Sequence, residues 1–159
     1  MMKILKNPLL GGFVSPLDGR LLSLQEVPDQ VFSQKILGDG FAIEPANGKV
    51  VSPVDGTVTI IMDSKHAVGL TSHAGLEVIV HFGIDTVNLQ GEGFKALVTA
   101  GDKVTAGQPL LEVDVNTVKD KVPTIITPIV FTNLTGQTVI VKAGHTVNRG
   151  EPIAFLLQQ

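Results

Sequence analysis

The sequence predicts a mainly β protein, packed as a sandwich or a flattened barrel with at most short helices, and two observations support this fold class. Its apolar stretches, among them KVVSPVDGTVTIIM, GLEVIVHFGI and TVIVKAG, are rich in Val and Ile and partly alternate with polar residues. They are bounded by Gly, Pro, Asn and Asp, and none keeps a helical period for long. Two sequence motifs also occur twice, which indicates an internal duplication.

The first duplicated motif is predicted to be a tight turn that leads into a strand. VSPLDGRL begins at Val14, and VSPVDGTV begins at Val51. Proline fixes φ where a turn needs it and glycine allows a positive φ, so these residues set backbone angles rather than contact a substrate. The second motif occurs as AGDKVTAGQPLLEV from Ala100 and as AGHTVNRGEPIAFL from Ala143. Two such pairs predict two similar halves packed face to face.

The chain of 159 residues suits one compact domain. No long linker divides it, so we expect a single domain over residues 13–159, preceded by a flexible tail at residues 1–12. Within the opening MMKILKNPLLGG, the run KNP interrupts the apolar residues before they reach the length of a signal peptide or a membrane span. Residues 115–122 (VNTVKDKV) are expected to form a short helix that ends at Pro123.

Composition and charge argue against several kinds of function. The formal net charge of -3 provides no basic field that would attract nucleic acid or acidic lipid. Cysteine is absent, so the chain has no disulfide framework, no thiolate nucleophile and no sulfur ligand for a metal. A reducing compartment such as the cytoplasm is compatible with this composition. Any metal would need His, Asp or Glu ligands.

Two of the four histidines are predicted to face each other across a hairpin. His66 and His81 lie on either side of a Thr-Ser-His-Ala-Gly turn in SKHAVGLTSHAGLEVIVHFGID. A turn centred near His73 and Ala74 pairs residues whose numbers sum to 147: Leu70 with Glu77, Val68 with Ile79, and His66 with His81. Such neighbours have Cβ atoms roughly 4.5 to 5.5 Å apart. By the alternation of a strand, Val68 and Ile79 would share one face and supply an apolar patch for the histidines.

The remaining histidines are predicted to be structural. His73 lies in the turn of the hairpin, and His145 occupies the position of Asp102 in the repeat, a solvated turn. The facing pair is different, because two charged imidazoles would repel and an apolar surrounding disfavours charge, so both pKa values should fall. A neutral imidazole is a nucleophile.

Three chemistries fit a facing histidine pair. Zinc-dependent hydrolysis would use His66, His81 and Asp85, but the H-x-H half of the corresponding metallopeptidase pattern is missing. A swinging-arm carrier would need a lysine in a motif such as Met-Lys-Met, which the sequence lacks. In a phosphohistidine relay, one imidazole attacks a phosphoryl group and its neighbour holds the charged oxygens, and this reading uses every feature present. A purely structural or binding module is the remaining alternative.

The strings GDGFAIEP, SPVDGTV, KHAVGL and VHFGIDTVNLQGEGF, with the closing repeat, resemble one known family. It is the glucose-family enzyme IIA component of the bacterial phosphoenolpyruvate-dependent sugar phosphotransferase system. The resemblance runs from about Phe13 to the C-terminus. It implies an antiparallel β-sandwich, a flattened barrel-sandwich hybrid, with an internal duplication.

The resemblance also implies roles for single residues. His81 would accept phosphate from the phosphocarrier HPr and pass it to a cysteine on the IIB domain of a glucose-type permease. His66 would hold the phosphoryl group, and Ser64, where the family usually has Thr, would form a hydrogen bond with the His66 imidazole. The residues expected to contact a partner, the last two placed by the hairpin register alone, are Asp39, Asp85, Phe41, Val68 and Ile79.

We therefore expect a cytoplasmic phosphotransferase component that acts on a permease supplied separately or that is a domain of one. It would require no cofactor and would hold no tight metal. Zinc would bind at His66 and His81 only where a partner supplies a carboxylate. Regulatory targets are compatible with such a carrier, whereas nucleic acid and a membrane span of its own are not expected. The alternative is a zinc-dependent hydrolase that uses His66, His81 and Asp85.

Overall fold

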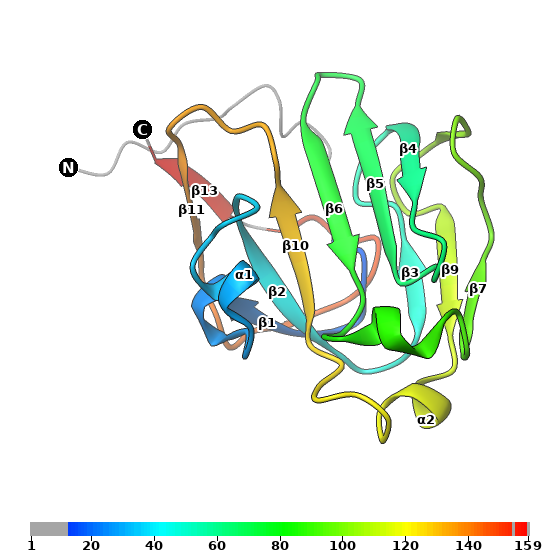
Figure 1. The fold of residues 1–159 in the computed structure, drawn as a ribbon. Helices are drawn as coiled ribbons and strands as arrows, with labels where there is room; N and C mark the ends of the chain where they lie inside the picture. Colours follow the sequence, from blue (N-terminus) through cyan, green and yellow to red (C-terminus); the bar gives the residue numbers. More distant parts are fainter. Residues whose placement is uncertain (1–12, 154, 159) are drawn as a thin grey trace.

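The computed structural model describes residues 13–153 and 155–158, and these residues are mainly β (Figure 1). The tail predicted at residues 1–12 lies outside the described residues. An antiparallel sheet forms the middle of the molecule. Its strands, in spatial order, are β12 (Thr146–Val147), β1 (Gly19–Ser23), β2 (Asp39–Pro45), β10 (Thr127–Phe131), β6 (Glu77–His81), β5 (Ala67–Ser72), β4 (Gly56–Ile61) and β8 (Lys103–Val104).

Two smaller antiparallel sheets complete the sandwich. One contains β3 (Lys49–Val51), β9 (Pro109–Val113) and β7 (Phe94–Ala96), and the other pairs β11 (Thr138–Val141) with β13 (Phe155–Gln158). Side chains from the large and the small sheets bury one shared apolar core, to which β2 contributes Phe41, β9 contributes Leu111 and β11 contributes Val139. In the described chain no sheet closes into a barrel, so the predicted antiparallel sandwich is confirmed.

The two copies of the duplicated turn make the same hydrogen bonds. The Ser15 hydroxyl donates to the carbonyl of Leu17 at 2.6 Å, and the Ser52 hydroxyl donates to the carbonyl of Val54 at 2.7 Å. Both serines are fully buried. Because a buried hydroxyl needs a partner, each turn satisfies its own serine locally.

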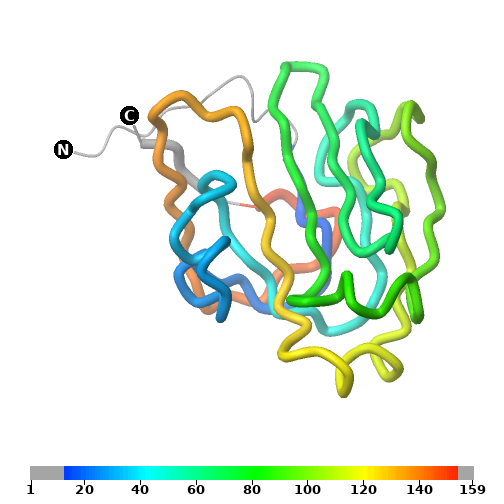
Figure 2. The backbone as a smooth tube through the Cα atoms, viewed as in Figure 1, coloured from blue at the N-terminus to red at the C-terminus, as the bar shows by residue number. Residues whose placement is uncertain are grey.

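The second duplicated motif packs on the first in the same way in both halves. β12 pairs with β1 through Gly19 and Val147, and β8 pairs with β4 through Gly56 and Val104. The start of the described chain, blue in Figure 2, also lies beside the segment that follows β12.

The two halves of the duplication are not the separate facing layers that the sequence predicted. Each contributes four strands to the large sheet, since β12-β1-β2-β10 is mirrored by β8-β4-β5-β6, and ladder hydrogen bonds between β10 and β6 join them side by side.

The described helices are short, as predicted. They are the 3₁₀ helix η2 (Leu24–Glu26), α1 (Gln30–Ser33), the 3₁₀ helix η3 (Thr86–Leu89) and α2 (Val115–Val118). The α2 helix covers only the first half of the predicted residues 115–122. Asp114 caps its start, but Val and Thr favour helix only weakly, so the chain leaves the helix after one turn. No described helix has the length and apolar character needed to cross a membrane.

The hairpin of β5 and β6 exists, but its predicted register is wrong by one residue. Val68 pairs with Val80, and Gly69 pairs with Ile79. The loop has three residues and ends with Gly75 at φ 95°, a conformation that glycine adopts easily, and Ser72 N donates to the carbonyl of Leu76 at 2.9 Å across it. Because the loop has three residues instead of the predicted two, every pair of the hairpin is shifted by one residue. Val68 and Ile79, which were predicted to share one face, therefore lie on opposite faces.

Candidate functional site

The two histidines lie side by side despite the changed register. His81 is the last residue of β6, and His66 lies immediately before β5. Their ring centroids are 4.8 Å apart, and the rings are nearly perpendicular at 79°. Lys65 adopts φ 58°, so the backbone turns just before His66. The direction of the His66 side chain is therefore not set by the alternation of side chains along β5. His66 is only 3% exposed, whereas His81 is half-buried.

A backbone carbonyl fixes the orientation of the His81 ring. Nδ1–H of His81 donates to the carbonyl of Gly83 at 2.8 Å. In a neutral imidazole this leaves the lone pair on Nε2. Gly83 has φ 72°, and a Cβ atom there would lie 2.8 Å from Cγ2 of Thr86 and 3.2 Å from the carbonyl oxygen of Thr124. The chain therefore requires glycine at this position.

Two fully buried threonines support the Gly83 loop. The Gly83 N–H donates to Oγ1 of Thr127 at 3.4 Å, and the Thr86 hydroxyl donates to the carbonyl of Phe82 at 2.8 Å. Sequence reasoning did not select these residues, since Thr127 is far from His81 along the chain. The closeness of Thr86 to the HFGID motif was the only available signal.

Both imidazoles favour the neutral form. Burial, with a smaller contribution from a charge on His81, lowers the pKa of His66 to about 4. Burial also lowers the pKa of His81, although the hydrogen bond to Gly83 and the carboxylates of Asp29 and Asp85 act in the opposite direction. At neutral pH the site therefore presents uncharged rings, one of them with a free lone pair on Nε2.

An aromatic ring and a carboxylate reach the site from α1, and sequence reasoning missed both. The ring centroid of Phe32 lies 5.1 Å from that of His81, with the rings inclined at 57°. Asp29 is the N-cap of α1, accepting a hydrogen bond from the Val31 N–H at 2.8 Å, and its charge acts on His81. No local sequence signal connects α1 with β6, because the contact depends on the order of strands in the sheet.

Ser64 does not make its predicted hydrogen bond in this structure. Its hydroxyl donates instead to the carbonyl of Val87 in η3, at 3.4 Å. Nδ1 of His66 is buried and has no hydrogen-bond partner among residues 13–153 and 155–158. A buried nitrogen without a partner costs free energy, and the Ser64 hydroxyl, two residues away, is close enough in the chain to supply one.

The two aspartates predicted to flank the site differ. Asp85 is exposed, has φ 60° and is the N-cap residue of η3, four residues after His81 in the chain. Asp39 lies on β2 and pairs with Phe131 of β10. In the sheet, β2 is two strands away from β6, which carries His81. Its carboxylate accepts hydrogen bonds from the N–H of Val139 and of Gly40, both at 2.8 Å, and forms an ion pair with Lys35 at 3.3 Å. Asp39 is thus committed to contacts within the fold.

The predicted apolar partner face needs a correction. Phe41 and Val68 are fully buried at 0% exposure, so neither lies on the surface. Phe41 sits on the inner face of β2, and Val68 turns inward because of the changed hairpin register. Ile79 stays on the outer face and is half-buried. On the elements that carry the site, the exposed apolar side chains are instead Val31 in α1 and Val87 in η3.

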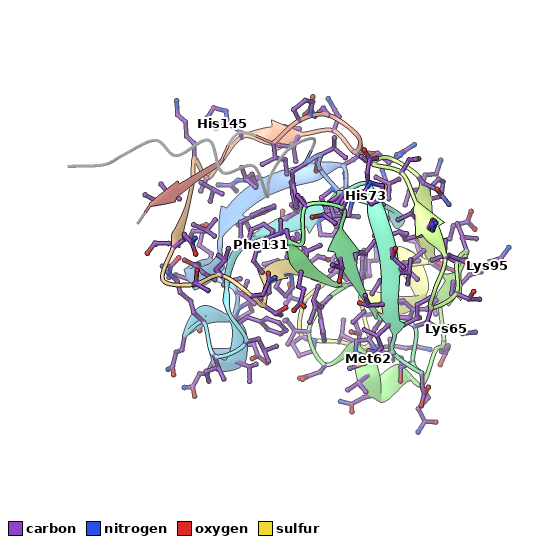
Figure 3. The ribbon with its side chains drawn as sticks, turned by 90° about the horizontal axis from the view of Figure 1, so that it is seen from above. Met62, Lys65, His73, Lys95, Phe131 and His145 are labelled. Atoms are coloured by element: carbon purple, nitrogen blue, oxygen red, sulfur yellow. The ribbon has the colours of Figure 1, made fainter. Side chains whose placement is uncertain are left out.

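The zinc-hydrolase alternative requires a third ligand beside the two histidines. Within the described part of the chain, no group of three or more His, Asp or Glu side chains is placed so that it could hold a metal ion. Asp85 therefore does not complete a site with His66 and His81. The other two histidines, His73 and His145, are exposed turn residues. In Figure 3 both lie away from Met62 and Lys65, which are close to His66 in the chain.

Sequence comparison identifies relatives of the chain. A sequence model of a family described as phosphoenolpyruvate-dependent sugar phosphotransferase system, EIIA 1, matches residues 12–137. The chain is 46% identical over 147 residues to the PTS system glucose-specific EIICBA component of Staphylococcus carnosus (strain TM300). It is 46% identical over 148 residues to the glucoside-specific EIICBA component of the same organism. Each alignment covers 92% of the chain but only 22% or 21% of the relative, so the chain spans about a fifth of their length.

A solved structure agrees with this assignment. Glucose permease IIA from Mycoplasma capricolum matches with a TM-score of 0.84 and 43% sequence identity, over 90% of this chain and 93% of that one. The predicted resemblance is confirmed, and the zinc-hydrolase alternative receives no support. The chain belongs to the EIIA 1 family of the phosphoenolpyruvate-dependent sugar phosphotransferase system, a family of phosphotransferase components in sugar transport.

Proposed function

We propose that Nε2 of His81 carries a phosphoryl group from the phosphocarrier HPr to the IIB domain of a glucose-type sugar permease. The observation that supports this best is the hydrogen bond from Nδ1 of His81 to the Gly83 carbonyl, which leaves the Nε2 lone pair free. That lone pair attacks the phosphorus atom in line. The donor's bond to phosphorus breaks, and its electron pair returns to the donor.

The second half of the relay reverses the first. A thiolate of the IIB domain attacks the phosphorus atom, the bond between Nε2 and phosphorus breaks, and its electron pair returns to the His81 imidazole. A carrier must not hold the group too tightly. The exposed carboxylate of Asp85 follows His81 closely in the chain, so a dianionic phosphoryl group experiences repulsion there that assists its departure.

His66 holds the phosphoryl oxygens rather than carrying the group. Its ring adjoins that of His81, is almost completely buried and is neutral at pH 7. A neutral imidazole can donate one N–H to a phosphoryl oxygen if its other nitrogen accepts a hydrogen bond. The Ser64 hydroxyl would supply that bond to Nδ1 of His66 by turning away from Val87. A Ser64→Ala variant should therefore pass its phosphate to a IIB domain several-fold more slowly.

The partners dock on the face that carries His81. Ile79 lies on this outer face, and Val31 and Val87 expose apolar surface on α1 and η3, the elements that flank it. Asp85 provides negative charge for basic residues of a partner. Small apolar surfaces with charged rims suit transient complexes. The relay needs no cofactor, and we place its action in the cytoplasm, where HPr would supply the phosphate.

Transfer of labelled phosphate from phosphoenolpyruvate, through enzyme I and HPr, tests the proposal. The wild-type chain and a His73→Gln control, altered at an exposed turn, should take up label. His81→Gln should take up none. His66→Gln should accept label but fail to pass it to a IIB domain. Uptake by His81→Gln at the wild-type rate would refute the assignment of the nucleophile, and an unlabelled wild type would refute the relay.

A further inference from the structure

The short helix α1 belongs to a small apolar cluster on the outer face of the large sheet. Phe32, at 6% exposure, is buried in this cluster, which is separate from the main core. Its other buried members are Leu22, Leu24, Val27, Ala42, Ile84 and Val130. Ile84 follows the Gly83 loop that orients His81, so the cluster extends from β1 to the candidate site.

Phe32 is the member of this cluster that contacts His81. Ring centroids 5.1 Å apart and inclined at 57° lie within the range of a favourable aromatic contact. The imidazole of His81 therefore has three fixed neighbours: the Gly83 carbonyl at Nδ1, the His66 ring and the Phe32 ring. Of these neighbours, only the His66 ring was predicted from the sequence.

The helix that carries Phe32 is held at both ends. Asp29 caps its start through the Val31 N–H. Lys35, just after the helix, forms an ion pair with Asp39 at the start of β2. The cap defines where the helix begins, whereas the ion pair and the burial of Phe32 in the cluster hold α1 against the sheet.

We propose that Phe32 is a positioning residue that keeps the His81 ring in its Gly83-bonded orientation and keeps water away from the phosphoryl group on Nε2. The inference rests on the proposed phosphorylation of His81. The competing reaction is hydrolysis, in which a water oxygen attacks phosphorus and the bond from Nε2 to phosphorus breaks. The electron pair returns to Nε2, the water proton goes to solvent or to the imidazole, and inorganic phosphate leaves. A relay is effective only if this reaction is slow compared with transfer.

The lifetime of the phosphorylated protein tests this role. In Phe32→Ala, release of labelled inorganic phosphate from the isolated phosphoprotein should be at least about tenfold faster than in the wild type, because the ring that shields and orients the imidazole is gone. Phe32→Leu, which restores apolar bulk, should recover part of the lifetime. Leu24→Ala is the matched control, since Leu24 is also buried in the cluster but belongs to η2. Equal acceleration in Leu24→Ala and Phe32→Ala would overturn the proposal, because general loosening of α1 would explain both.

A second measurement does not depend on phosphorylation. Imidazole ¹⁵N NMR on the unphosphorylated protein at pH 8 reports which His81 nitrogen carries the proton. The wild type and Leu24→Ala should show one form, protonated at Nδ1, whereas Phe32→Ala should show a mixture of the two tautomers. Unchanged His81 signals in Phe32→Ala would refute the positioning role even if the relay is correct. A wild type that takes no label would refute the relay while leaving the NMR comparison valid.

Discussion

The candidate site and its counterpart in the other half of the duplication occupy matching places in the large sheet but carry different side chains. Gly56 pairs with Ser72, and its equivalent Gly19 pairs with Pro45. Six residues before Ser72 is His66, and six residues before Pro45 is Asp39. The two residues therefore occupy corresponding positions of the fold.

His81 has an equally clear counterpart. It pairs with Ala67, and the residue equivalent to Ala67, Gly40, pairs with Val130. Val130 is 1% exposed under the cluster of α1, whereas His81 remains half-buried at the surface. The duplication thus provides two matching corners, of which only one carries the chemistry. The internal duplication explains why the two corners share a strand arrangement. The site exists at one corner only, because the residue types differ there and because His81, unlike Val130, is not fully covered.

The largest effect should come from replacing His81 with valine, the residue type at its counterpart position, Val130. In His81→Val, phosphate labelling should fall to background, because no nucleophile remains at the end of β6. The fold should be kept, since valine suits a half-buried strand position. Labelling and thermal unfolding measured on the same sample separate the two effects. Label retained by a folded His81→Val protein would mean that another residue carries the phosphate.

The second largest effect should be a loss of stability at low pH that arises at the corner with His66 and not at the counterpart corner. The pKa of His66 is lowered from its ordinary value of 6.5 to about 4, so the unfolded chain binds more protons between these values. The stability contributed by neutral His66 is complete above pH 6.5 and is lost as the pH falls toward 4, on the order of 3 kcal/mol in total.

Denaturant unfolding between pH 4 and pH 7 measures this loss. His66→Gln should show a correspondingly flatter decline, while His145→Gln, changed at an exposed turn, should follow the wild type. Parallel curves for the wild type and His66→Gln would mean that the pKa of His66 is the same in the native and the unfolded protein, so that burial does not lower it.

At the counterpart corner, Asp39→Ala should destabilise the protein by about 2 kcal/mol, with a much smaller effect on the phosphate-labelling rate of the folded protein, because Asp39 reaches the site only indirectly, through Lys35 and α1. Stability is lost because the N–H of buried Val139 loses its acceptor and Lys35 loses its ion-pair partner. Asp39→Asn, which keeps an acceptor oxygen, should recover part of the stability. A slower labelling rate at unchanged stability would restore the partner-contacting role that the sequence suggested for Asp39.

The smallest effects should come from the duplicated turns. Ser15→Ala and Ser52→Ala each remove a buried hydroxyl that bonds within its own turn, and each should cost about 1 kcal/mol of stability. The two losses should be similar, because the turns make the same hydrogen bonds. Urea unfolding of both variants and of the double variant checks this. A large difference between the two would show that one half depends on its turn more than the other.

The sequence determined the parts of this protein that depend on local residue types. Alternating Val and Ile specified strands, and Pro and Gly specified the duplicated turns, because these preferences act within a few residues. The motifs around His66 and His81 were sufficient to identify the histidine pair and the family. The exposed turn positions of His73 and His145 also followed from their neighbours in the chain.

Only the tertiary structure decided which residues meet across the sheet. A three-residue loop ending at Gly75 moved the hairpin by one position and turned Val68 into the core, a change that alternation alone does not reveal. The order of strands placed Asp39 at the counterpart corner and brought Phe32 onto His81. These contacts join segments distant in the chain, and they are set by long-range hydrogen bonding and packing, which no local pattern encodes.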